Sequence, residues 1–169
     1  MAKRKKSSQL ISLITVASCI LGLVAVVMMF LPAIGIKETD KTYTGLQIAF
    51  GYKTQIPILG EAVVFNFSFM NLLTYILALA GTVVAVLGLV GKNFAGSLFR
   101  FIAAGCFIVS AVFFFLSLNF CLPNDSATQI ITFIGGNIKE SGTLAAGSII
   151  GGVAAGLAGI CELGAVFAK

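Results

Sequence analysis

Long apolar runs separated by shorter polar segments form the dominant pattern of the chain. A run of about 20 apolar residues is long enough to cross the roughly 30 Å hydrocarbon core of a bilayer as a helix. Four runs meet this condition, at residues 9–31, 69–90, 98–118 and 143–167. The pattern therefore predicts an all-α membrane protein, a bundle of four transmembrane helices that makes residues 1–169 a single tetraspan domain.

The two longer polar segments, residues 32–68 and 119–142, connect the first span to the second and the third span to the fourth. Two stretches within the first segment, Tyr43–Phe50 and Val63–Phe69, alternate between apolar and polar positions. Alternation with β-branched and aromatic residues is typical of strands. We expect a small extracellular β-hairpin or sheet in this loop, and a loop without strands is the alternative.

The distribution of basic residues gives the four spans a direction. Cations crowd the shortest segments, at residues 3–6, Lys92, Arg100 and Lys169, whereas those of the two long loops are dispersed and offset by acids. The positive-inside rule therefore places both termini in the cytoplasm and both long loops outside. We expect a multi-pass protein of the plasma membrane.

The overall composition agrees with a lipid environment. The chain is 59% hydrophobic and 10% charged, whereas a soluble domain has about 25% charged residues. Its net charge of +5 comes largely from residues 3–6. A basic cluster next to a long apolar run is typical of an anchor at anionic lipid headgroups. The bilayer is therefore the first expected partner, and we expect no binding of nucleic acid.

Residue types that support catalysis are scarce. The chain has no histidine, which is the commonest general base and metal ligand. Its four cysteines lack the spacing of a metal site or of a CxxC motif. The spans contain no cluster of acidic residues. The sequence therefore predicts no catalytic residues, no metal ligands and no cofactor.

The fourth span is unusually rich in small residues at four-residue spacing. Glycine in a helix costs about 1 kcal/mol relative to alanine in water, but rows of small residues let a neighbouring helix approach closely in a membrane. The rows contain the candidate packing residues Gly147, Gly151, Gly152, Gly156 and Gly159. We expect these residues to pack against another helix of the same chain, and a homodimer contact is the alternative.

Glu162 is the acidic residue that lies well inside an apolar span. It precedes Phe167 by five residues, which places it roughly 7 Å from the inner boundary at about 1.5 Å per residue. Arg100 lies in the first turn of the third span, at a similar depth on the same side, so an ion pair between Glu162 and Arg100 is the favoured interpretation. Pairing with Lys169, exposure to water at the boundary, and a proton or cation site are the alternatives.

The layout resembles that of the claudin-like tetraspan membrane proteins. The shared features are four spans, inner termini, a longer first outer loop with strand-like runs, and a shorter second loop. That family has a Gly-Leu-Trp motif and two cysteines in its first loop, where this chain has Thr44-Gly45-Leu46-Gln47 and no tryptophan or cysteine. The resemblance implies a structural or accessory membrane protein with an outer recognition surface.

These features lead to a non-enzymatic integral membrane protein as the main functional hypothesis. Its outer loops would meet a protein partner, or copies of the chain would form a homo-oligomer. A small channel or transporter subunit that uses Glu162 is the alternative. An enzyme acting at the outer interface through Asp40, Glu61 or Asp125 is a weaker third hypothesis.

Overall fold

The structure is a computed structural model that describes residues 2–37, 41–56, 60–91, 93–122 and 142–168. Several sequence predictions therefore lie outside the described residues. They concern Asp40, Lys92, Asp125, Lys169 and most of the second long loop.

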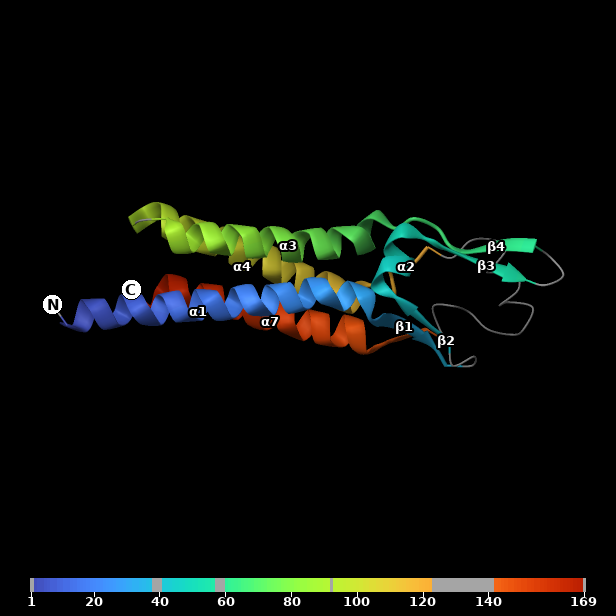
Figure 1. Cartoon of the computed structure of the whole chain (residues 1–169), viewed down its shortest axis with the longest axis horizontal. Coiled ribbons are helices and arrows are strands. Elements are labelled where there is room, and N and C mark those ends of the chain that lie inside the picture. The colour runs from blue at the N-terminus through green and yellow to red at the C-terminus, as the bar shows by residue number, and fades with distance from the viewer. Residues whose placement is uncertain (1, 38–40, 57–59, 92, 123–141, 169) are drawn as a thin grey trace.

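Four long helices run side by side along the length of the molecule (Figure 1). They are α1 (Ala2–Val27), α3 (Phe69–Val90), α4 (Asn93–Leu116) and α7 (Ala146–Phe167). Each contains a segment long and apolar enough to cross a membrane. This confirms the prediction of four helices with the length and composition of membrane spans. The helices pack in a closed ring, α1 on α3, α3 on α4, α4 on α7 and α7 on α1.

Helix boundaries differ from the sequence prediction at both ends of the first and third spans and at the start of the fourth. The first span ends in a 3₁₀ turn, η1 (Met28–Phe30), before the chain becomes extended at Leu31. The helix α4 begins at Asn93 rather than at residue 98. The connection between α3 and α4 is therefore shorter than predicted, and the two helices form a tight antiparallel pair.

Large apolar side chains cover the outside of the bundle. Leu13 is 70% exposed and Ile160 is 64% exposed. The interior instead contains mainly alanine, with the rings of Tyr75, Phe107 and Phe114 between the helices. Small interior residues and a continuous apolar exterior are typical of helices that pack closely in lipid.

A three-stranded antiparallel sheet lies at one end of the bundle. Its strands are β1 (Pro32–Ile36), β2 (Lys41–Thr44) and β5 (Gly142–Leu144), in the order β2-β1-β5. Ile34 of the central strand pairs with Tyr43 on one side and with Leu144 on the other. The sheet therefore ties the segment after α1 to the segment before α7.

A second, two-stranded antiparallel sheet lies beside it. Its strands are β3 (Tyr52–Ile56) and β4 (Gly60–Phe65). Both sheets lie at the same end of the bundle, and both chain termini lie at the opposite end (Figure 1). The prediction of a small antiparallel sheet is confirmed, although the strand β5 was not foreseen.

The prediction of a strand over the whole of Tyr43–Phe50 is wrong. The strand stops at Thr44, and a short helix, α2 (Gly45–Phe50), follows. A capping box starts this helix: the Thr44 side chain accepts a hydrogen bond from the Gln47 backbone N–H, and the Gln47 side chain accepts one from the Thr44 N–H. These two bonds satisfy orphan amide donors of the first turn and favour a helix over a strand.

Glycine is required at the start of α2 because a helix approaches it closely. A Cβ atom on Gly45 would lie 2.7 Å from Tyr75 Cζ of α3 and 3.0 Å from the Met29 carbonyl oxygen.

The predicted strand Val63–Phe69 is also shorter than expected, since β4 ends at Phe65 and the Ser68 side chain caps α3 by accepting from the Asn71 N–H. The sheets and α2 are thus anchored directly on the helix ends.

Candidate functional site

Glu162 lies in the interior of the helix bundle. Its side chain is fully excluded from solvent, and its Oε1 atom forms a hydrogen bond with the hydroxyl of Ser18 on α1. The second carboxyl oxygen, Oε2, is buried and has no hydrogen-bond partner. Glu162 thus joins α7 to α1 through one oxygen and leaves the other unsatisfied.

The neighbouring face of α1 is polar as well. Ser18 is fully buried, and its Oγ atom lies 2.9 Å from the Thr15 carbonyl oxygen. Thr15 is also fully buried, and its hydroxyl donates to the Ile11 carbonyl at 3.1 Å. We call Thr15, Ser18 and Glu162 the Glu162 cluster.

Arg100 has a different polar contact from the one predicted. Its guanidinium Nη2 donates to the Gly88 carbonyl oxygen of α3 at 3.0 Å, and its buried Nε atom has no partner. Arg100 is close enough to attract a negative charge on Glu162. The hydrogen bonds give the two groups different partners, Ser18 for Glu162 and Gly88 for Arg100, so their ion pair stays a prediction.

The glycines of α7 lie mainly against α4. A Cβ atom on Gly151 would lie 2.6 Å from the Phe114 ring, one on Gly152 would lie 2.9 Å from the Phe115 ring, and one on Gly159 would lie 2.8 Å from the Ile108 side chain. Gly156 has more room, since its Cβ would lie 3.8 Å from Ala111 Cβ. Gly147 instead meets the Pro32 carbonyl oxygen of β1, at 2.7 Å. This face of small residues is therefore covered by α4 and β1 of the same chain.

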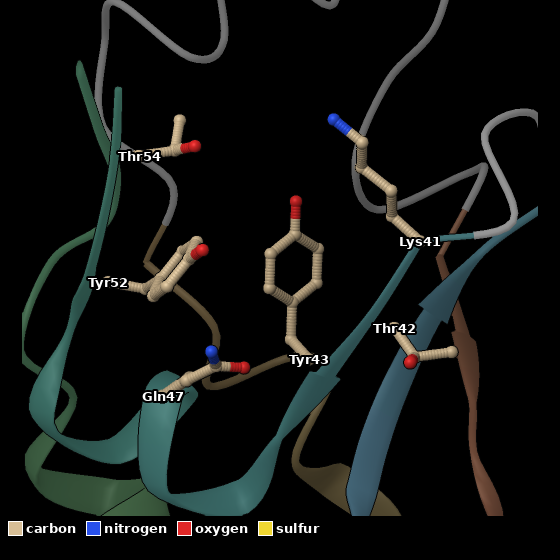
Figure 2. A pocket seen from close by; sticks show the side chains of 6 residues that line it. All are labelled: Lys41, Thr42, Tyr43, Gln47, Tyr52 and Thr54. Atoms are coloured by element: carbon tan, nitrogen blue, oxygen red, sulfur yellow. The ribbon is translucent and has the colours of Figure 1, made fainter. Parts of the chain in front are cut away.

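A pocket of about 210 Å³ opens at the sheet end of the molecule. Side chains from β2, the first turn of α2 and β3 surround it (Figure 2). We call it the outer pocket, and its lining residues are Lys41, Thr42, Tyr43, Gln47, Tyr52 and Thr54. The hydroxyl of Tyr43 points into the space between Lys41 and Thr54 (Figure 2).

Aromatic packing fixes the position of Tyr43. Its ring is edge-on to Tyr52, with centroids 5.8 Å apart, and edge-on to Phe65 at 4.8 Å. Burial, followed by electrostatic repulsion from Tyr52 and Cys121, raises the pKa of the Tyr43 hydroxyl. Tyr43 therefore presents a neutral phenol to the pocket at neutral pH.

Cys121 belongs to the apolar core that also contains Tyr43 and Phe65. Burial raises the pKa of its thiol to about 12. The thiolate is the nucleophilic form of cysteine, so the neutral Cys121 thiol has a packing role. All four cysteines are free thiols.

The outer pocket is suited to recognition by hydrogen bonds. It combines an ammonium group, two phenols, two threonine hydroxyls and one amide. Within the described ranges, no three cysteine, aspartate or glutamate side chains are grouped closely enough to hold a metal ion. The lining groups can donate to and accept from a polar ligand, whereas they include no nucleophile paired with a base.

Sequence reasoning missed two features of these sites. Ser18 has no sequence signal that marks it as the partner of Glu162, because the rotation of α1 against α7 is set only by packing. The pocket had a weak signal, since two of the three tyrosines of the chain, Tyr43 and Tyr52, lie in the first long loop.

The chain matches no protein-family model, and no relative is found for it among curated proteins.

Proposed function

We propose that this chain is a tetraspan protein of the plasma membrane, with both termini and the α3–α4 turn in the cytoplasm. Its role is structural or accessory rather than enzymatic, and its outer loops recognise a partner. The positive-inside distribution of cations supports the orientation. The resemblance to claudin-like proteins is one of layout, with strands in the first outer loop.

The outer pocket is the observation that carries the recognition role. Loops that only connected spans would not need two sheets, a capped helix and a pocket with six polar or aromatic side chains. Tyrosine and other polar side chains of this kind favour reversible recognition of a protein or other polar partner. The role therefore belongs to the sheet end of the molecule.

Purification in mild detergent, followed by identification of co-purifying proteins, tests this role. Lys41→Glu reverses a charge in the pocket. Lys37→Glu makes the same change at an exposed position that lies at the same end of the molecule but does not line the pocket. We expect a protein recovered with the wild type and with Lys37→Glu to be lost with Lys41→Glu. Equal recovery with all three proteins would show that the pocket does not recognise that partner.

A channel or transporter subunit is the second candidate function. The buried, unpartnered Oε2 of Glu162 favours it, because an intramembrane acid is a candidate site for an ion or a proton. Ion and proton flux into liposomes containing the purified protein tests this function. Flux that is abolished by Glu162→Gln would support it, and an absence of flux above that of empty liposomes would exclude it.

A further inference from the structure

We propose that Glu162 is an intramembrane proton-binding site, in which the carboxyl group holds a proton at neutral pH and donates it to Ser18 Oγ. Ser18 in turn donates its own hydroxyl hydrogen to the Thr15 carbonyl. The result is an uncharged hydrogen-bond chain from α7 into α1. This inference does not depend on the recognition role of the outer loops.

Counting hydrogens leads to this assignment. Ser18 Oγ is within hydrogen-bonding distance of two oxygens, the Thr15 carbonyl at 2.9 Å and Glu162 Oε1. A serine hydroxyl has a single hydrogen, and an ionised carboxylate is an acceptor only. With Glu162 ionised, both oxygens would compete for that hydrogen. A protonated Glu162 supplies the second hydrogen, so that both contacts become hydrogen bonds.

The unpartnered oxygen points to the same protonation state. Oε2 is buried and accepts no hydrogen bond. The cost of burying an unpaired carboxylate is far higher than the cost of burying an unpaired neutral carbonyl. With the proton on Oε1, Oε2 is a neutral carbonyl oxygen, which is the form that this surrounding tolerates best.

Two other titratable or charged groups act on Glu162 within the described part of the chain. Arg100 of α4 attracts a negative charge on the carboxyl group, and Cys19 of α1 is the neighbouring thiol. Arg100 uses a guanidinium hydrogen on the Gly88 carbonyl, so its positive charge is stabilised by α3 independently of Glu162. An ionised Glu162 paired with Arg100 is the competing arrangement, and the experiments below separate the two.

Binding of this proton couples the contact between α1 and α7 to pH. Loss of the proton removes the donor to Ser18 and places a charge in the bundle interior. The bundle should therefore become less stable as pH rises and the site loses its proton.

Infrared spectroscopy of the protein in liposomes tests the proposal directly. At pH 7 the wild type should show the carbonyl stretch of a protonated carboxylic acid, with a shift in D₂O. This band should be absent in Glu162→Gln and retained in Glu61→Gln, which makes the same change in β4 outside the bundle. A wild-type spectrum without the band at pH 7, or a band that persists in Glu162→Gln, would overturn the proposal.

Thermal unfolding provides a second readout. The glutamine amide can replace the carboxyl hydrogen as donor to Ser18, so Glu162→Gln should keep the wild-type midpoint at pH 7, whereas Glu162→Ala should lower it. The Glu162→Gln protein should also lose the decrease in stability at alkaline pH. If Glu162 is ionised and paired with Arg100, Glu162→Gln will instead be as unstable as Glu162→Ala, and the proposal fails.

Discussion

A methyl group added at Gly151 should destabilise the bundle through its effect on Phe114. The Cβ atom would lie 2.6 Å from Phe114 Cε1 and 2.8 Å from Cζ. Phe114 is fully buried and its ring is edge-on to Tyr75, with centroids 5.2 Å apart. The ring therefore has to move into a filled core, and overpacking of this kind costs about 1–3 kcal/mol.

Gly164→Ala is the matched control for this prediction. It makes the same change in the same helix, but beyond the adjoining turns of that helix its Cβ atom meets nothing within 4 Å. The helix-propensity gain of up to about 1 kcal/mol is common to both variants, so the difference between them isolates the contact with Phe114. Thermal unfolding in mild detergent should give a midpoint for Gly151→Ala that is several degrees below that of Gly164→Ala.

A compensating change makes the test stricter. Gly151→Ala should cost less stability in a Phe114→Leu background than in the wild type, because the smaller side chain leaves space for the added methyl group. Equal or higher stability of Gly151→Ala relative to Gly164→Ala would refute the close packing of α7 on α4.

Three further predictions concern the sheet end of the molecule. Thr44→Ala should destabilise α2 by about 1 kcal/mol, because it removes the cap. Amide hydrogen exchange in Gly45–Phe50 should become faster, and unchanged exchange would argue against the capping box. Because burial raises the pKa of Tyr43, a component of the phenolate absorbance with the amplitude of one tyrosine should appear at higher pH than in a free tyrosine and be lost in Tyr43→Phe. Loss of a component that titrates in the ordinary range would contradict this. Cys121, with a thiol pKa of about 12, should react with maleimide at pH 8 only after unfolding, whereas rapid labelling of the folded protein would be inconsistent with its burial.

The spans were predictable from the sequence because their signal is local. An apolar run of sufficient length has few structures open to it in lipid, where the backbone must form its own hydrogen bonds. The small antiparallel sheet was also predictable from alternation. The order of the helices around the bundle was not predictable from the sequence. The helix α1 is apolar on most of its surface, and its sequence does not mark the face that meets α7.

The errors arose where non-local contacts or short polar motifs decide the structure. Alternation over Tyr43–Phe50 predicted a strand, but the capping box of Thr44 and Gln47 forms a helix there. The strand β5 has only three residues, Gly142–Leu144, and exists because it pairs with β1, more than 100 residues earlier. The partner of Glu162 was not predicted because Ser18 reaches it only through the packing of α1 on α7.

Cysteine accessibility in intact cells is the most direct test of the four-span topology. In a variant without the native cysteines, Lys37→Cys places a thiol at the sheet end and Lys169→Cys places one at the carboxyl terminus. We expect a membrane-impermeant maleimide to label Lys37→Cys in intact cells, and to label Lys169→Cys only after the membrane is permeabilised. Labelling of Lys169→Cys in intact cells, or extraction of the protein from membranes by alkaline carbonate without detergent, would contradict this topology.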